Sequence, residues 1–296
     1  MVTVIMMKDT LIKATAFNQT IRIYAADTTT VCETARTIHD LWPTAAAALG
    51  RLLTVSAMMG TMLKDDQTMT VRIEADGPLK GLLTTSNTRG EVRGYVGNPH
   101  VMLQYDSGKL NVGQAVGKGF IHVTKDLKIR DTFTSSSPLQ TGEIGEDFAY
   151  FFTASEQIPS AVGVGVFVET DHTVQHAGGF LVQVMPGCSE DTLQIVEEAV
   201  ANMPPVTDLL REGATPEDLI KRFAGDTYTL LETVELAYRC DCNHAKFERG
   251  LIALGADALT ELLEEDGHVE TACHFCGQTY DFDEAALSEL ITRTRL

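Results

Sequence analysis

The stretches "RCDCNH" (residues 239–244) and "TACHFCGQ" (residues 271–278) decide how the C-terminal part of this chain folds. They hold four of the six cysteines of the chain, in two closely spaced pairs with thirty residues between them: Cys240, Cys242, Cys273 and Cys276. A chain of 296 residues that otherwise uses thiols sparingly must have a chemical reason to concentrate them here.

The pattern C-x-C followed by C-x-x-C-G is typical of a zinc site. Zinc takes four ligands at the corners of a tetrahedron, and thiolate sulfur binds it at about 2.3 Å. In C-x-x-C-G the turn directs two sulfur atoms to one point, and Gly277 can take a backbone conformation that a side chain resists. We therefore predict that Cys240, Cys242, Cys273 and Cys276 bind one Zn²⁺ per chain.

Two other interpretations of these cysteines stay open: they could be ordinary thiols, or the redox centre of a thiol-disulfide oxidoreductase. Such an enzyme needs C-x-x-C where a strand passes to a helix in a βαβ unit. Here "QTYDF" (residues 278–282) follows the pair and predicts a strand. His244 and His274 could replace a thiolate, but four cysteines already complete the shell, so we expect both imidazoles to be exposed to solvent.

The C-terminal segment is too small for its apolar core alone to make it comfortably stable. Residues 240–296 are 57 residues with 12 acidic and 4 basic side chains, and a core alone becomes sufficient at about 70–80 residues. A structural zinc contributes about 10–16 kcal/mol to folding in small finger peptides, so we expect the fold to depend on the metal. Thiolates are also what oxidants attack, and a closely spaced pair can form its own disulfide.

Composition argues against several classes of partner. The net charge is −18 and the pI is about 4.7, a balance that repels phosphate backbones and anionic lipid surfaces. We therefore predict no nucleic-acid and no membrane partner. The N-terminus lacks a secretory pattern, and the most apolar stretch (residues 45–63) contains Arg51 and two glycines, which indicates a packed helix. We expect a cytoplasmic protein whose thiols are reduced.

The rest of the chain predicts an α+β fold, with an N-terminal mixed α/β core over residues 1–185. Pro43 begins a helix of about twenty residues with a broad apolar face. From Met69 to Val168, alternating apolar residues separated by Gly, Pro and Asn predict a sizeable sheet, interrupted by a helix near Gly145. Met58, Met59 and Met62 are of the adaptable kind that promiscuous surfaces use, but helix core is the favoured interpretation.

Residues 186–238 predict a helical linker. Ser189 is placed to cap a helix that two prolines end, and Thr215 with Pro216 has the pattern of a second helix start. Alternation at Val234 and the next apolar residues predicts a strand that leads into Cys240. The small zinc-binding domain follows over residues 239–296.

The chain resembles the heat shock protein 33 family, the redox-regulated holdase chaperones of the bacterial cytoplasm. The resemblance covers nearly the full length and rests on the C-x-C…C-x-x-C signature together with four further stretches. These are "YAADTTTVCETARTIHDLWPTAAAALGRLLTVSAMMGTMLK" (residues 24–64), "NVGQAVGKG" (residues 111–119), "TASEQIPSAVGVGV" (residues 153–166) and "GGFLVQVMPG" (residues 178–187).

The resemblance implies a zinc-bound, reduced form that is inactive. It implies that oxidation pairs Cys240 with Cys242 and Cys273 with Cys276, releases zinc, and unfolds the C-terminal domain and the linker. The apolar surface then exposed would hold unfolding client proteins without ATP, in a homodimer. The sequence itself assigns no client-binding residues.

The remaining motifs do not indicate a nucleotide-binding site or a catalytic site. "NVGQAVGKGF" (residues 111–120) does not meet the phosphate-loop pattern, and no hydrolase motif occurs, so we do not expect an enzyme. Cys32 is expected to be an ordinary helix thiol, and Cys188, after a Pro-Gly turn, to be more exposed. Besides the holdase, a zinc-ribbon protein-interaction module and the oxidoreductase remain as alternative functions.

Overall fold

The structure is a computed structural model that describes residues 8–129 and 131–294, and it divides into two units, Met1–Arg239 and Cys240–Leu296. The first unit combines two large sheets with helices, and the second combines helices with a two-stranded sheet. The predicted α+β class is therefore confirmed. The predicted boundaries at residues 185 and 238 stay predictions as functional divisions of the chain.

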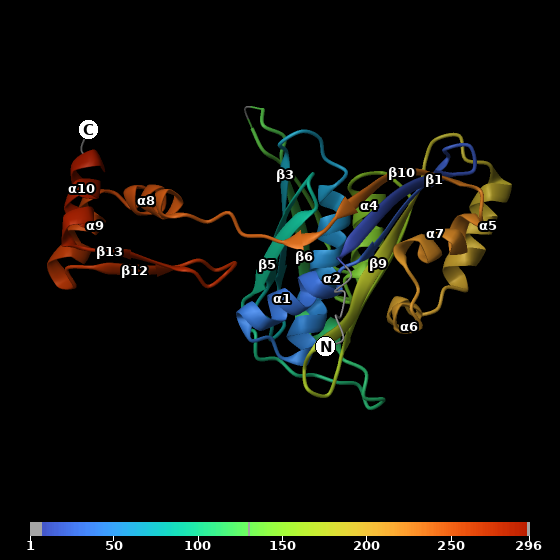
Figure 1. Cartoon of the computed structure of the whole chain (residues 1–296), viewed down its shortest axis with the longest axis horizontal. Helices are drawn as coiled ribbons and strands as arrows, with labels where there is room; N and C mark the ends of the chain where they lie inside the picture. The colour runs from blue at the N-terminus through green and yellow to red at the C-terminus, as the bar shows by residue number, and fades with distance from the viewer. Residues whose placement is uncertain (1–7, 130, 295–296) are drawn as a thin grey trace, which may run out of the picture. The chain divides into compact units, whose positions relative to one another are not determined.

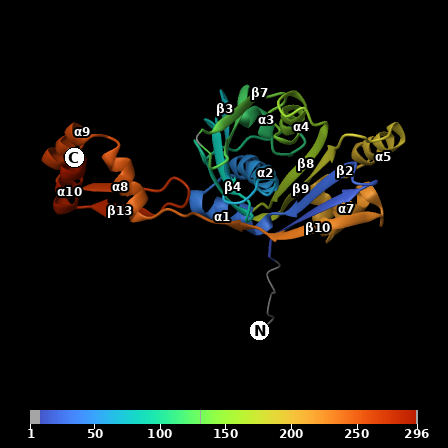
Figure 2. The ribbon, with the colours of Figure 1, turned by 90° about the horizontal axis from the view of Figure 1, so that it is seen from above.

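Helix α2 (Pro43–Gly60) is the centre of the first unit, and all of its residues are buried. Figure 2 shows why: the helix runs between the two sheets, so that both of its sides are covered. The sequence predicted a packed helix with a broad apolar face, and the structure buries the remaining faces as well. In the structure the Arg51 guanidinium is buried and paired with Glu143 at 2.5 Å, and Met58 and Met59 lie in the core as predicted.

The first sheet has the order β10-β1-β2-β9-β8, and its neighbouring strands are antiparallel. Its strands are β1 (Thr10–Ala16), β2 (Ile21–Asp27), β8 (Ser160–Val168), β9 (Val174–Val184) and β10 (Tyr228–Glu235). Both faces are covered: α2 lies on one, and three later helices lie on the other. The central strands are therefore buried almost throughout, as continuous apolar runs require.

The second sheet has the order β11-β5-β4-β3-β6-β7. Its strands are β3 (Thr68–Ala75), β4 (Leu82–Asn87), β5 (Glu91–Val96), β6 (Gly119–Asp126), β7 (Phe133–Pro138) and β11 (Ala237–Tyr238). Buried residues alternate with partly exposed ones along β4 and β5, so this sheet has one core face and one face toward solvent. Ser56 of α2 bonds to Thr84 of β4 at 2.5 Å on the core face.

Three shorter helices complete the core of the first unit: α1 (Thr29–His39), α3 (Val112–Val116) and α4 (Gly145–Ala154). Asp147 of α4 is fully buried, and its carboxylate accepts four backbone N–H groups from the loop before the helix. Because a buried carboxylate is costly unless its lone pairs are satisfied, these bonds fix that loop and with it Glu143, the partner of Arg51.

Helices α5 (Glu190–Ala201), α6 (Val206–Arg211) and α7 (Pro216–Ala224) form a second layer on the first sheet, as Figure 1 shows. Their caps are the predicted ones: the Ser189 side chain accepts from Thr192 N, and Thr215 with Asp218 forms a capping box. Phe180 of β9 packs against Phe223 of α7 with ring centroids 4.8 Å apart and the rings tilted by 58°. Helix α5 is held less firmly, since Val196 is the residue of this helix that is buried.

Strands β10 and β11 return the chain from these helices to both sheets. β10 is the edge strand beside β1, and a register shift opposite Lys13 and Ala14 leaves Leu231 as an extra residue, a β-bulge. β11 is two residues long and pairs with β5. The Tyr238 hydroxyl donates to Gly94 O at 2.9 Å and lies 3.1 Å from His39 Nε2, and Arg239 N donates to Val92 O.

The second unit contains helices α8 (His244–Ile252), α9 (Ala256–Glu265) and α10 (Glu284–Thr294), and strands β12 (Val269–Ala272) and β13 (Thr279–Phe282). Strand β13 was predicted from the sequence, whereas β12 was not. The core of this unit consists of few buried side chains: Leu251, Leu259, Phe282, Leu287, Leu290 and Ile291. Across both units, the described helices include none of the length and apolarity that crossing a bilayer demands.

Asp9 is a buried carboxyl at the entrance of β1. Its two oxygens accept from Thr30 N at 2.9 Å and Val31 N at 2.6 Å, the first turn of α1, and its carbonyl accepts from Leu236 N. Burial raises the pKa of Asp9 from 3.8 to about 6, against the lowering effect of these two backbone donors. Folding therefore binds a proton at Asp9 between about pH 4 and pH 6.

We predict that Asp9 makes the first unit less stable as pH rises through this window. The folded state binds the proton more tightly than the unfolded state, so protonation stabilises the fold at low pH. As the carboxyl ionises, the free energy of unfolding falls by an amount on the order of 2–3 kcal/mol. Urea unfolding followed by Trp42 fluorescence at pH 4, 5, 6 and 7 measures it. The loss should be absent in Asp9→Asn, and an equal pH dependence in both proteins would contradict the assignment.

Candidate metal centre

The second cysteine pair lies in the turn between β12 and β13. Cys273 N donates to Gln278 O at 2.9 Å, and Gly277 N donates to Cys273 O at 2.8 Å, which closes the turn. Gly277 has a φ of 72°, the left-handed region in which a glycine is favoured. The sequence therefore folds this stretch into a tight knuckle, and the hairpin holds both of its thiols on one side.

The first pair lies in the stretch that precedes α8. Asn243 caps this helix, because its side chain accepts from Lys246 N at 3.0 Å. Asp241, between the two cysteines, pairs with Lys246 Nζ at 2.5 Å. A helix start thus fixes the backbone directly after Cys242, while the residue between the cysteines points to a charge partner instead of the sulfurs.

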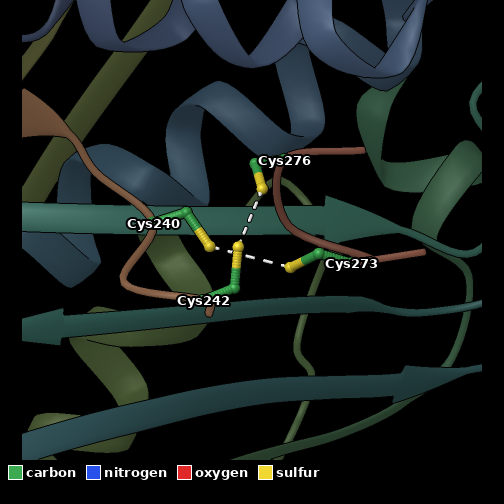
Figure 3. Close-up of side chains that lie close together, drawn as sticks. All are labelled: Cys240, Cys242, Cys273 and Cys276. Carbon is green, nitrogen blue, oxygen red and sulfur yellow. Dashed lines mark hydrogen bonds between the residues drawn. The ribbon is translucent and has the colours of Figure 1, made fainter. Parts of the chain in front are cut away.

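The structure brings the four thiols together, as Figure 3 shows: the sulfur atoms point toward one another from two separate stretches of chain. All four Sγ atoms lie within 4.8 Å of one another. Cys240 Sγ is 3.6 Å from Cys273 Sγ, and Cys242 Sγ is 3.3 Å from Cys276 Sγ. Ligands at about 2.3 Å from a tetrahedral zinc are separated by about 3.8 Å, so the spacing fits one such ion.

The chemistry of the donor set also fits a soft divalent cation. Burial raises the pKa of Cys240, and burial together with the neighbouring thiols raises that of Cys276 to about 12. Burial acts the same way on Cys242, but the hydrogen bonds from Tyr280 and Cys276 outweigh it and lower its pKa. Four sulfurs this close cannot all ionise without a cation between them, and thiolate is the form that binds zinc.

Aromatic side chains surround the first pair. Tyr280 of β13 donates its hydroxyl to Cys242 Sγ at 3.1 Å, and its ring stacks on Phe247 of α8 with centroids 4.5 Å apart. The hydrogen bond to Cys242 raises the pKa of Tyr280 to about 12, so the hydroxyl keeps its proton and acts as donor. Sequence analysis missed Tyr280; its place in the strand after the C-x-x-C turn was the available signal.

The two histidines lie where they were expected, exposed to solvent. His244 pairs with Glu248 through Nδ1 at 3.1 Å and packs on Phe282, and His274 is exposed in the knuckle. Neither belongs to the cluster of four. Cys32 is buried in α1, where burial raises its pKa to about 12, and Cys188 is partly buried at the start of the α5–α7 layer.

Fold and site together define a class of protein: an α+β unit joined to a small C-terminal module that carries four converging cysteines. The family profile described as "Hsp33 protein" matches residues 9–283. The chain belongs to this family of chaperones.

Curated relatives and a solved structure agree with this assignment. The 33 kDa chaperonin of Geobacillus kaustophilus is 47% identical over 287 residues, covering 96% of this chain and 98% of the relative. The 33 kDa chaperonin of Desulforamulus reducens is 45% identical over 289 residues, covering 97% and 98%. The crystal structure of a 33 kDa chaperonin, a heat shock protein 33 homolog from Thermotoga maritima, matches with a TM-score of 0.91 and 35% identity over 98% and 99% of the two chains.

We predict that removing the metal unfolds the second unit and leaves the core of the first unit around α2 folded. A strong chelator with a thiol reductant should abolish hydrogen-exchange protection in α8–α10, because six buried apolar residues do not stabilise 57 residues alone. Trp42 fluorescence, which reports on the first unit, should not change. Cys273→Ser should behave like the chelated protein, and Cys188→Ser, as matched control, like the wild type. A second unit that stays protected without metal would refute this dependence.

Proposed function

We propose that this protein is an ATP-independent holdase whose activity is switched on by oxidation. In the reduced form, Cys240, Cys242, Cys273 and Cys276 hold one Zn²⁺, the second unit is folded, and the protein is inactive. Under oxidative stress in the cytoplasm the four thiols become two disulfides, zinc leaves, and the protein binds unfolding client proteins as a homodimer.

The observation that carries this proposal is the convergence of four thiols in a unit with so small a core. Zinc contributes to such a unit most of the free energy that folds it. Any reaction that consumes the ligands is therefore a reaction that unfolds the unit. Membership of the Hsp33 family, whose curated relatives are named chaperonins, supports client binding as the output.

The redox step balances with peroxide as oxidant. One thiolate attacks a peroxide oxygen and becomes a sulfenic acid; its neighbour displaces water and forms the disulfide. Two peroxides thus take four electrons, give two disulfides, and yield four water molecules once protons from the solvent are included. A disulfide sulfur has no negative charge to offer the metal, so zinc is released. We propose the pairs Cys240 with Cys242 and Cys273 with Cys276, the neighbours in sequence.

The connection to the first unit supports a spread of unfolding into residues 186–238. β11 is two residues long, and its last residue, Tyr238, is two positions before Cys240. When the second unit unfolds, the chain on the C-terminal side of this short strand is no longer folded, and the strand remains connected to folded structure on its N-terminal side alone. Beyond it lie β10, an edge strand, and α5, in which Val196 is buried. Elements with few buried contacts are those that open at low free-energy cost.

Opening this segment would expose apolar surface for clients. Phe180, Leu219 and Phe223 meet between the first sheet and the α5–α7 layer, and separating the layers presents them to solvent. Leu230 and Leu231 on β10 are already 51% and 55% exposed. A contiguous apolar patch of this kind is a binding site for other proteins.

The oxidoreductase alternative fits the site less well. Such enzymes place C-x-x-C where a strand passes to a helix, so that a helix N-terminus activates one thiol. Here both thiols lie in a turn between two antiparallel strands. A zinc-ribbon interaction module remains the second candidate, because the same hairpin would present a metal-stabilised surface in the reduced state.

We predict that zinc release and client holding rise together. Reduced protein treated with peroxide at elevated temperature should release about one zinc per chain, measured with a chromophoric chelator, and suppress aggregation of a thermally unfolding client in step. A thiol reductant with zinc should reverse both. Zinc loss without client holding would instead favour the interaction module.

A variant separates unfolding from disulfide formation. Replacing all four cysteines by serine removes the metal and the disulfides together, so the second unit cannot fold. We expect this variant to hold clients without oxidant, because unfolding and not the disulfide exposes the surface. The matched control is Cys32→Ala with Cys188→Ser, which should stay inactive until oxidised. An inactive four-serine variant would contradict the mechanism.

A further inference from the structure

Tyr280 joins the two halves of the metal centre. Its backbone belongs to β13, the strand that leaves the knuckle of Cys273 and Cys276, and it pairs with Thr271 of β12. Its hydroxyl reaches the other half and donates to Cys242 Sγ at 3.1 Å. One side chain therefore connects the hairpin to the C-x-C stretch without being a ligand itself.

The position of this hydroxyl is fixed by packing. The ring of Tyr280 stacks on Phe247 at a centroid distance of 4.5 Å and an interplanar angle of 26°. On the other side of the chain, Thr271 Oγ1 donates to Tyr280 O at 3.3 Å. A donor held by a ring stack and a strand pair loses little entropy when it bonds the sulfur, so the bond is pre-organised.

We propose that Tyr280 is a positioning residue for the metal. Its hydrogen bond to Cys242 orients this ligand and raises the affinity of the site for its ion. A hydrogen bond to a ligand sulfur spreads its negative charge and fixes the direction of its lone pairs, and groups around a metal that orient its ligands are worth about 10–100-fold in affinity. The inference rests on the proposed function only in that the four cysteines bind a metal.

The first test compares Tyr280→Phe with the wild type in zinc affinity. Phenylalanine keeps the stack on Phe247 and removes only the donor. With the reduced full chain and a competing chelator, we expect zinc to bind about 10-fold more weakly to the variant. Tyr150→Phe is the matched control: Tyr150 is an exposed tyrosine on α4 of the first unit, and its loss should leave the affinity unchanged. Equal affinities for the wild type and Tyr280→Phe would overturn the proposal.

A spectroscopic readout separates the hydrogen bond from a general effect on folding. In the cobalt(II)-loaded protein, the thiolate-to-metal charge-transfer band should move to lower energy in Tyr280→Phe, since an unbonded sulfur gives up its electrons more easily. The band is read at saturating cobalt, where weaker binding has no influence. An unshifted band would overturn the proposal even if the affinity fell.

A third measurement needs no variant. In wild-type protein loaded with cadmium-113, the hydroxyl proton of Tyr280 should couple to the metal through Cys242 sulfur, and a hydroxyl without such coupling would overturn the proposal. These outcomes are distinct from failure of the proposed function. A wild type that binds no zinc overturns both, whereas a wild type that binds zinc regardless of Tyr280 overturns this inference alone.

Discussion

Four sulfur atoms that lie close enough to share one cation are the constraint that shapes the second unit. Without the ion, four close thiols repel ionisation, and the few apolar residues behind them do not offset the conformational entropy of the surrounding segments. With it, the turn at Gly277 and the start of α8 are fixed to a common point. The rest of the unit is then a set of short elements arranged around that point, so a cation bound there would supply much of its stability.

The first unit follows the opposite principle. Its stability comes from a helix that both sheets enclose. The charges buried inside it have partners in the same unit: Arg51 pairs with Glu143, although its Nε has no hydrogen-bond partner among the described residues, and Asp147 accepts from four backbone donors. A chemical change at the four cysteines would therefore act on the fold of the second unit and leave the core around α2 folded.

Many elements of this organisation could be predicted from local sequence patterns, and others could not. The spacing of the four cysteines, the caps at Ser189 and Thr215, and the proline start of α2 depend on neighbours in sequence, so they could be predicted. The burial of Arg51 on all sides could not, because it depends on a sheet that closes over α2 from far along the chain. The bond from Tyr280 to Cys242 was missed for the same reason: 38 residues separate its partners.

The bulge in β10 affects how readily another extended chain can add to this edge of the first sheet. A long, regular, unpaired strand would offer its backbone to any other extended chain, and Leu230 and Leu231 would make that contact attractive. The extra residue at Leu231 interrupts the regular spacing of backbone hydrogen-bonding groups along this edge. Glu232 and Glu235, paired with Lys13 and Lys8, place charged side chains there. Both features make this edge a poor template for the addition of another strand.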